Sequence, residues 1–331
     1  MITFHLPSGE AIVPPDLAAI PDLAQRAVWI DLLRPTRPEE LAVEKALSVE
    51  VPTREEMQQL ELSRRLYDEN GTLFMTATVL TGADSSHPES AGITFILLSD
   101  RLVTVRYTEP RAFQSFFAHR SAHLADHATP RTIFEGLVDA IVERLADIME
   151  ATGAMVEDLS QEIFRDQGGA PQPKGERPAQ RNYNTILQKL GRASDLVARS
   201  RESLVSLGRV VAFFRETHKD DATALSTVEH FATVSGDFAA LADYATFLSG
   251  KSSFLLDATL GMISNEQNAI IKLVSVAALV FGPPTLIASI YGMNFEHMPE
   301  LHWVYAYPLA VLTMVLSAIF PYVFFKRRGW L

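Results

Sequence analysis

The residues with the most specific chemistry lie near the C-terminus, in a short polar loop between two uncharged stretches. Gly292, Met293 and Asn294 directly follow the first stretch, and Glu296 and Glu300 come next. An amide oxygen accepts hydrogen bonds without carrying a charge, and Mg²⁺ gives up its coordinated waters reluctantly. By itself, Asn294 is more typical of a helix cap or turn; repeated around a symmetry axis, however, it would form an uncharged oxygen ring that could recognise a hydrated divalent cation and act as a selectivity filter. The two glutamates would concentrate cations at the loop electrostatically.

The two uncharged stretches that flank the loop, 273–290 and 303–325, approach the length of about 20 residues that crosses a bilayer. The basic residues at their outer ends are Lys272, Lys326, Arg327 and Arg328. No Lys or Arg lies between the stretches. Because basic residues stay on the cytoplasmic side, we expect two spans in the inner membrane, both termini in the cytoplasm and the loop 291–302 outside. The basic residues would then form a ring at the inner interface, in contact with lipids.

The first span is unusual for a simple anchor because it contains residues that loosen a helix and expose backbone or hydroxyl oxygens. These residues are Ser275, Gly282, Pro283, Pro284, Thr285 and Ser289. Such residues are tolerated where a helix faces protein or a water-filled path, so the first span is the better candidate for pore lining. Two spans cannot enclose a pore, and a conducting state therefore requires a homo-oligomer with closed symmetry.

The preceding residues are expected to position these spans. Residues 1–130 are predicted to form an α/β domain with a small, largely antiparallel sheet. A buried-strand pattern at 27–33 precedes a helix that begins at Pro38. Two hairpins follow, with turns at Asn70-Gly71 and at Ser99-Asp100.

Helical periodicity dominates the rest of the chain. Residues 131–221 are predicted to form two long, antiparallel amphipathic helices, separated by a Gly- and Pro-rich break at 168–180. After this region, a stalk helix is expected at 222–272. Nothing forces it to stop before the first span, so one helix of about 60 residues could run into the membrane. The basic tail 326–331 ends the chain.

Composition excludes several classes of function. The chain has no Cys, so it cannot form disulfides or thiolate metal sites. Residues 1–271 carry 25 basic and 38 acidic side chains, which opposes nucleic-acid binding. The N-terminus has no signal-peptide pattern, and we expect the long N-terminal part to stay cytosolic. The common catalytic and nucleotide-binding motifs are absent from the sequence. We therefore expect that the chain is not an enzyme and binds no organic cofactor.

The C-terminal pattern resembles the CorA family of Mg²⁺ transporters. The resemblance is carried by Tyr291-Gly292-Met293-Asn294-Phe295, by Met298-Pro299-Glu300-Leu301, by the second span and by the basic tail. It implies a homopentamer with a cytosolic α/β domain, stalk helices that continue as pore-lining spans, and an outer helix that ends in a basic ring. It also implies Mg²⁺ as the transported ion, with Co²⁺ and Ni²⁺ as further substrates.

The resemblance also implies which residues line the pore. Asn268, Ile271, Val274, Ala278, Gly282 and Thr285 match the pore-lining positions of the family. Their spacing of three, four and seven keeps them on one helix face. Thr285 and Asn268 would form polar rings above and below a hydrophobic neck of Ile271 and Val274, which closes by dewetting. Asp257 matches a position near the inner mouth.

In the family, intracellular Mg²⁺ gates the pore by bridging acidic residues of neighbouring cytosolic domains. Loss of the ion loosens the ring and opens the pore, which gives negative feedback if Mg²⁺ binds the closed state better. The candidate ligands of this regulatory Mg²⁺ are Asp84, Glu89, Asp237 and Asp243.

Two other functions remain open. His119, His123 and His127 are spaced four apart, as in some Zn²⁺ sites, and keep a Zn²⁺ transporter of the ZntB type possible. However, the first and third would lie about 12 Å apart along a helix, too far for one ion, which favours an exposed helix face. The chain could also be a membrane-anchored sensor or adaptor whose hairpin conducts nothing.

Overall fold

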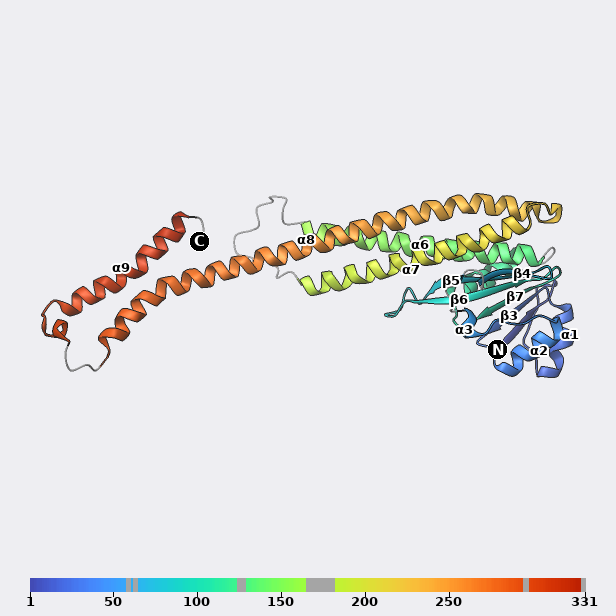
Figure 1. The fold of residues 1–331 in the computed structure, drawn as a ribbon, viewed down its shortest axis with the longest axis horizontal. Coiled ribbons are helices and arrows are strands. Elements are labelled where there is room, and N and C mark those ends of the chain that lie inside the picture. Colours follow the sequence, from blue (N-terminus) through green and yellow to red (C-terminus); the bar gives the residue numbers. More distant parts are fainter. Residues whose placement is uncertain (58–60, 62–64, 124–128, 165–181, 294–297, 329–331) are drawn as a thin grey trace. The chain divides into compact units, whose positions relative to one another are not determined.

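The structure is a computed structural model that describes residues 1–57, 61, 65–123, 129–164, 182–293 and 298–328. These residues fall into two compact units, Met1–Leu255 and Leu256–Leu331 (Figure 1). The first unit is an α/β domain with long helices, and the second contains the end of the longest helix and the C-terminal helix. This architecture confirms the predicted fold class of a single chain.

The described part of the first unit contains a seven-stranded sheet with the order β2-β1-β3-β7-β6-β5-β4. The strands are β1 (Ile2–His5), β2 (Ala11–Ile12), β3 (Trp29–Leu33), β4 (Leu66–Glu69), β5 (Thr72–Thr81), β6 (Glu89–Leu97) and β7 (Leu102–Arg106). Neighbouring strands are antiparallel except β3 and β7, which are parallel. The predicted strand and both predicted hairpins are confirmed, whereas β1 and β2 were not predicted.

The turn between β4 and β5 shows why the sequence specifies a hairpin there. Asn70 has φ of 54° and Gly71 has φ of 83°, and both values lie in the left-handed region that Asn and Gly tolerate best. The backbone N–H of Gly71 donates to Oδ1 of Asp68 over 2.9 Å. These two residues therefore fix the register of the hairpin.

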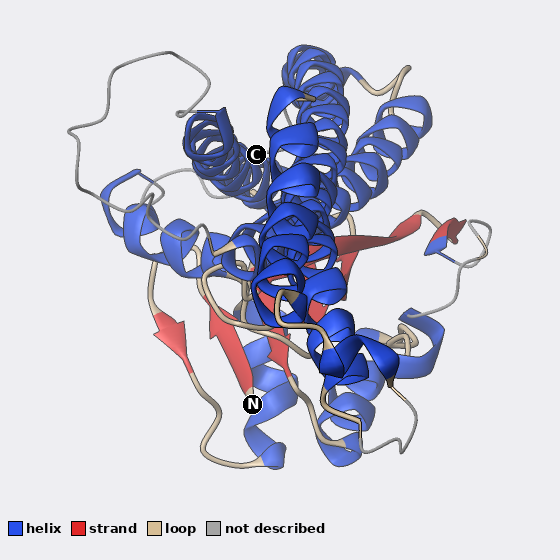
Figure 2. Cartoon of the chain, turned by 90° about the vertical axis from the view of Figure 1, so that its left-hand side faces the viewer, coloured by secondary structure: helices blue, strands red, loops and turns tan. Residues whose placement is uncertain are grey.

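Helices cover both faces of the sheet (Figure 2). One face packs against α1 (Ile20–Arg26), α2 (Arg37–Leu47) and α3 (Arg54–Met57), after a short 3₁₀ turn η1 (Leu17–Ala19). The other packs against α5 (Arg111–His123), α6 (Pro130–Phe164) and α7 (Tyr183–Thr217). Adjacent strand residues such as Phe95 and Ile96 belong to opposite cores, as the period of two requires. Both faces of the sheet are thus buried.

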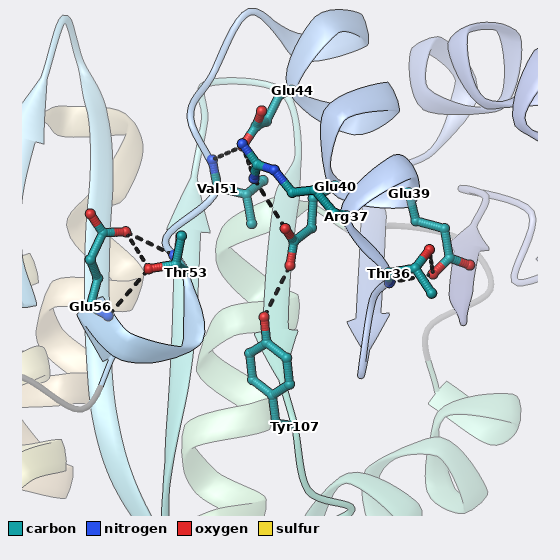
Figure 3. Close-up of polar contacts among 9 residues, drawn as sticks. All are labelled: Thr36, Arg37, Glu39, Glu40, Glu44, Val51, Thr53, Glu56 and Tyr107. Carbon is teal, nitrogen blue, oxygen red and sulfur yellow. Dashed lines mark hydrogen bonds and ion pairs between the residues drawn. The ribbon is translucent and has the colours of Figure 1, made fainter.

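Helix α2 begins at Arg37, one residue before the predicted start at Pro38, and a capping box precedes it. The backbone N–H of Thr36 donates to Oε2 of Glu39 over 2.8 Å, which occupies an otherwise free donor (Figure 3). Glu40 accepts hydrogen bonds from Arg37 over 3.1 Å and from the Tyr107 hydroxyl over 3.0 Å. Burial and this bond to Glu40 raise the pKa of Tyr107 to about 12. The first turn of α2 is therefore fixed to the end of β7.

A buried ion pair joins the two parallel strands. The Arg106 guanidinium on β7 lies 2.8 Å from Oδ2 of Asp31 on β3, and both side chains are almost completely buried. Thr104 donates to Oδ1 of Asp31 over 2.7 Å and accepts a bond from the Trp29 indole over 2.9 Å. Buried charges are tolerated only when paired and hydrogen-bonded in this way.

Helix α7 covers the part of β5 that β4 leaves without a partner. Strand β4 pairs only with the first residues of β5. Further along β5, the backbone N–H of Thr78 donates to the Ser206 hydroxyl and that of Leu80 donates to the Ser203 hydroxyl, both over 2.8 Å. Two serine hydroxyls thus take the place of a neighbouring strand and protect this edge.

Helix α8 (Leu225–Tyr291) follows a short 3₁₀ turn, η3 (Ala222–Ala224), and contains residues of both units. Its first part lies in the core with α6 and α7 through Phe231, Val234, Phe238, Ala245 and Leu248. The prediction that a stalk helix runs into the first span agrees with this unbroken helix. The second unit also contains η4 (Pro299–His302) and α9 (Ala306–Arg327). The boundary between the units, at Leu255, lies inside the predicted stalk.

Candidate ion pathway

Two segments of the described chain are long and apolar enough to cross a membrane. They are Ala222–Tyr291, which contains α8, and Ala306–Arg327, which is α9. Only 6% and 0% of their most apolar stretches are buried, so these stretches are not core helices of a soluble domain. Apolar surfaces of this length are normally covered either by lipid or by other protein. Both stretches are therefore candidate membrane spans.

Two helical hydrogen bonds of α8 are missing in the middle of the first span. Pro283 and Pro284 lie inside the helix and have no N–H. The carbonyl groups four residues earlier, those of Leu279 and Val280, therefore cannot receive the usual helical hydrogen bond. The Thr285 hydroxyl donates to the Phe281 carbonyl over 2.7 Å, which leaves its lone pairs free to accept. This segment offers oxygen acceptors without any charge.

A shallow, open depression lies on the surface of α8 around these residues. Its lining residues are Ala278, Phe281, Gly282, Thr285, Leu286 and Ser289. Three predicted pore residues, Ala278, Gly282 and Thr285, thus lie together on one wall. The prediction did not assign Ser289 to the pore face. Its position four residues after Thr285 could have identified it, because this spacing keeps the same face.

The inner part of the predicted pore face lies on the same helix. Asn268, Ile271 and Val274 are all exposed in the single chain, with Ile271 at 61% and Val274 at 62% exposure. Asp257, further along α8 toward its start, is also exposed. A single chain therefore covers neither the predicted neck nor the predicted inner mouth.

The outer loop begins directly where α8 ends. The Gly292 N–H donates to the Ala288 carbonyl over 2.9 Å, and the Met293 N–H donates to the Ile290 carbonyl over 3.2 Å. A Cβ atom at Gly292 would lie 3.2 Å from the Ala288 oxygen, closer than side chains usually come, which favours glycine. The predicted filter residue Asn294 and the predicted cation-attracting Glu296 lie outside the described residues. Of Glu300, only the backbone in η4 is described.

The predicted basic ring consists of residues on both helices of the second unit. Lys272 is exposed on α8, whereas Lys326 and Arg327 form the last turn of α9 and Arg328 follows it. Cations at a helix C-terminus interact favourably with the helix dipole. The Lys326 ammonium lies 5.8 Å from the centre of the Tyr322 ring, within the range of a cation–π contact. The helix end is thus suited to an interface between lipid and water.

The predicted regulatory acids are not gathered in one chain. Asp84, in the loop after β5, forms ion pairs with Arg111 over 2.8 Å and with Arg144. Two guanidinium groups would compete with Mg²⁺ for this carboxylate. Glu89 begins β6, and Asp237 and Asp243 are exposed on α8. Within the residues that the structure describes, no three acidic or histidine side chains are placed to hold a metal.

The histidines with the spacing of four lie at the end of α5. His119 and His123 belong to this helix, as expected, but their side chains lie outside the described part of the structure. His127 also falls outside the described residues. The prediction of an exposed helix face, and its Zn²⁺-binding alternative, therefore stay predictions.

Comparison with known proteins identifies close parallels over nearly the whole chain. Residues 24–327 match the sequence profile of a family described as CorA-like Mg²⁺ transporter protein. The chain is 32% identical over 306 residues to the magnesium transport protein CorA of Escherichia coli (strain K12), and the alignment covers 92% of each protein.

Solved structures show the same fold. The complete structure of the CorA magnesium transporter from Methanocaldococcus jannaschii matches with a TM-score of 0.71 at 15% identity, over 100% of this chain and 98% of the other. The ZntB cytoplasmic domain from Vibrio parahaemolyticus matches with a TM-score of 0.52 at 10% identity, over 72% of this chain and 88% of the other. The ZntB domain is thus the more distant of these two structures.

Proposed function

The chain belongs to the CorA family of Mg²⁺ transporters, and from this premise we propose that it is a divalent cation channel of the inner membrane that takes up Mg²⁺. The observation that carries the proposal is the continuity of α8. One helix begins in the core of the α/β unit and ends at Tyr291, three residues before Asn294. The cytosolic unit is thereby connected directly to the predicted filter.

The proposed assembly is a homopentamer in which α8 lines the pore and α9 faces lipid. Large apolar side chains of the second unit are exposed in the single chain, and both lipid and further copies of the chain would cover them. A ring of helices also requires rotational symmetry, which a homo-oligomer provides. In this arrangement both termini lie in the cytoplasm, as the basic residues at the outer ends of the spans favour.

The proposed selection acts on the hydrated ion. Each Asn294 amide oxygen would accept a hydrogen bond from a water that is bound to Mg²⁺, so the ion keeps its inner shell. Thr285 would repeat this contact deeper in the pore, since its lone pairs are free to accept. Asn268 would form the inner polar ring, and Ile271 and Val274 would close the neck between the rings by dewetting. Neutral oxygens hold the ion weakly enough for it to leave.

The proposed gate responds to intracellular Mg²⁺ that binds between neighbouring subunits. Glu89, Asp237 and Asp243 are the candidate ligands without an ion pair among the described contacts, whereas Asp84 has two arginine partners. Mg²⁺ can stabilise the closed state only if these carboxylates bind it more tightly there than in the open state. Asp257 at the inner mouth and Glu296 and Glu300 at the outer loop would concentrate the cation.

The chemistry proposed for this chain is ion selection, in which no covalent bond is made or broken. CorA-family proteins are transporters. We therefore assign the chain neither an enzymatic activity nor an organic cofactor.

The test is Mg²⁺ flux into proteoliposomes that contain the full chain. Asn294→Ala should lower the flux by at least about tenfold, which corresponds to about 1.4 kcal/mol in the free-energy barrier to permeation. Asn265→Ala is the matched control, because Asn265 has the same side chain on α8 outside the predicted face, and its flux should equal that of the wild type. Normal Mg²⁺ flux through Asn294→Ala would sink the filter and mean that the ion takes another pathway, whereas no flux in the wild type would favour a non-conducting adaptor. Flux of Zn²⁺ in preference to Mg²⁺ that requires a proton gradient would establish the ZntB-type alternative.

A further inference from the structure

The start of α8 is joined to α6 by one histidine that lies between two carboxylates. Nε2 of His230 on α8 lies 2.9 Å from Oδ1 and 3.0 Å from Oδ2 of Asp139 on α6. Nδ1 of the same ring lies 3.5 Å from Oε1 of Glu135. Glu135 and Asp139 are four residues apart and therefore share one face of α6. Each ring nitrogen thus has its own carboxylate.

This geometry depends on the charge of the imidazole. A protonated ring donates from both nitrogens and can serve both carboxylates, whereas a neutral ring has only one donor. When His230 is neutral, two carboxylates face one uncharged ring, and their mutual repulsion is no longer offset. The contact between α6 and α8 is therefore strongest in the protonated state.

The other basic groups at this junction have partners elsewhere. Arg131 of α6 lies 2.8 Å from Asp221, and Arg215 of α7 donates to the Ser235 hydroxyl over 3.3 Å. His218, which ends α7, stacks on Phe214. On α8 itself, the charged neighbours of His230 along the helix are Glu229 and Asp237. His230 is thus the cationic partner that the structure provides for Glu135 and Asp139.

The surroundings raise the pKa values of both His230 and Glu135 above their ordinary values. Burial lowers the pKa of His230. The hydrogen bond to Asp139 and the charges of Asp139 and Glu135 raise it by more, so the pKa lies above its ordinary 6.5. Burial and the charge of Asp139 raise the pKa of Glu135, against the opposing effect of His230. Because the folded state raises the pKa of His230, its contribution is complete below about pH 6.5 and is lost as the pH rises through the higher folded value.

A buried aromatic cluster limits what the loss of this contact can do. Phe231, the next residue on α8, is fully buried, with its ring centre 5.5 Å from that of Phe134 and 5.4 Å from that of Phe214. These contacts do not depend on pH. Release of His230 would therefore loosen α8 locally without unfolding the unit.

We propose that His230, Glu135 and Asp139 form a proton-operated clamp that holds the cytosolic start of α8 against α6 and releases it when the cytosol becomes alkaline. The inference rests on the proposed function, in which α8 continues as the pore-lining helix. Release gives that helix more freedom and raises the Mg²⁺ flux. The clamp thereby adds a response to cytosolic pH to the proposed response to Mg²⁺.

The clamp itself is tested by hydrogen exchange of the full chain in lipid nanodiscs between about pH 6 and about pH 8.5, corrected for the intrinsic pH dependence of exchange. Peptides from the start of α8 should lose protection as the pH rises in the wild type. His230→Gln should abolish this pH dependence, and Asp139→Asn, as a second variant, should weaken it. His87→Gln removes an exposed histidine of the loop after β5 and should behave as the wild type. The same pH dependence in His230→Gln as in the wild type would overturn the clamp.

Transport is measured separately, as Mg²⁺ flux in proteoliposomes with the cytosolic side at about pH 6 or about pH 8.5. The wild type should show higher flux at the higher pH, and His230→Gln should show a flatter profile. Equal pH profiles in both proteins would overturn the clamp as a regulator while Mg²⁺ transport stands. No flux at any pH, together with the expected hydrogen exchange, would instead overturn the proposed function and leave the contact between α6 and α8 intact.

Discussion

The two units of the chain differ in how far they bury their large side chains. In Met1–Leu255, large side chains such as Trp29 are completely buried, and the buried Asp31 has an arginine partner. In Leu256–Leu331, large apolar side chains such as Phe281 are 69% exposed. The first unit buries most of its large apolar side chains within the single chain, whereas those of the second unit stay exposed and would be covered by lipid and further copies of the chain in the proposed channel.

This difference indicates where function and stability can be separated. Substitutions inside the first unit remove contacts that the chain has already made, so they should change its free energy of unfolding. Substitutions on the predicted pore face would remove contacts that exist only in the proposed channel. They should change ion flux and leave the stability of the first unit unaltered.

The largest effect is expected from Asp31→Asn in the first unit. It leaves the buried Arg106 charge without its carboxylate, which should lower the free energy of unfolding by about 3–5 kcal/mol. The measurement is denaturant unfolding of the full chain in detergent, followed through the fluorescence of the tryptophans. The matched control is Asp195→Asn, which breaks a more exposed pair with Arg199 and should cost only about 0.3–0.5 kcal/mol. Equal losses in both variants would show that burial does not set the value of these pairs.

A smaller effect is expected from Ser203→Ala, which removes the hydroxyl that covers β5. The Leu80 N–H would lose its acceptor in a buried site, at a cost of about 1–3 kcal/mol in stability. Ser194→Ala, at an exposed position of the same helix, provides the control and should leave stability nearly unchanged. Hydrogen exchange of the β5 amides identifies the affected bond. Unchanged protection at Leu80 would mean that water or another group replaces the hydroxyl.

The smallest effect in energy is expected in the second unit, from Thr285→Val. This change should reduce Mg²⁺ flux by up to about tenfold, or about 1.4 kcal/mol, because one ring of acceptors is lost. Thr313→Val is the control, since that hydroxyl makes the same type of bond, to the Leu309 carbonyl over 2.8 Å, on α9. Neither variant should alter unfolding of the first unit. If both variants reduced flux equally, Thr285 would have no special position in the pathway.

Local features of the fold could be predicted well. Apolar residues at helical spacing predict the helices α6, α7 and α8, and Asn70-Gly71 predicts the β4–β5 turn. The uncharged stretches predict two spans, in agreement with the two apolar helices. Each of these signals depends on residues within a few positions of one another.

Pairings between distant residues could not be predicted in this way. The sequence does not reveal that β3 and β7 are parallel neighbours, so the pair Asp31 and Arg106 remained unseen. Asp84 reads as a free acid until α5 and α6 bring Arg111 and Arg144 to it. The strand β2 was missed because it has only two residues, whereas β1 is as long as the predicted β4 but pairs with the distant β3.

The sequence by itself indicated the two candidate spans, the long helix that leads into the first of them and the polar stretch with Asn294, because length, hydropathy and charge order are properties of a continuous segment. Only the tertiary structure decided which charges are paired. His230 and Asp139 are 91 residues apart in the chain, and Asp31 and Arg106 are 75 apart. Their energies depend on distance and burial, which follow from the order of the strands and the packing of the helices.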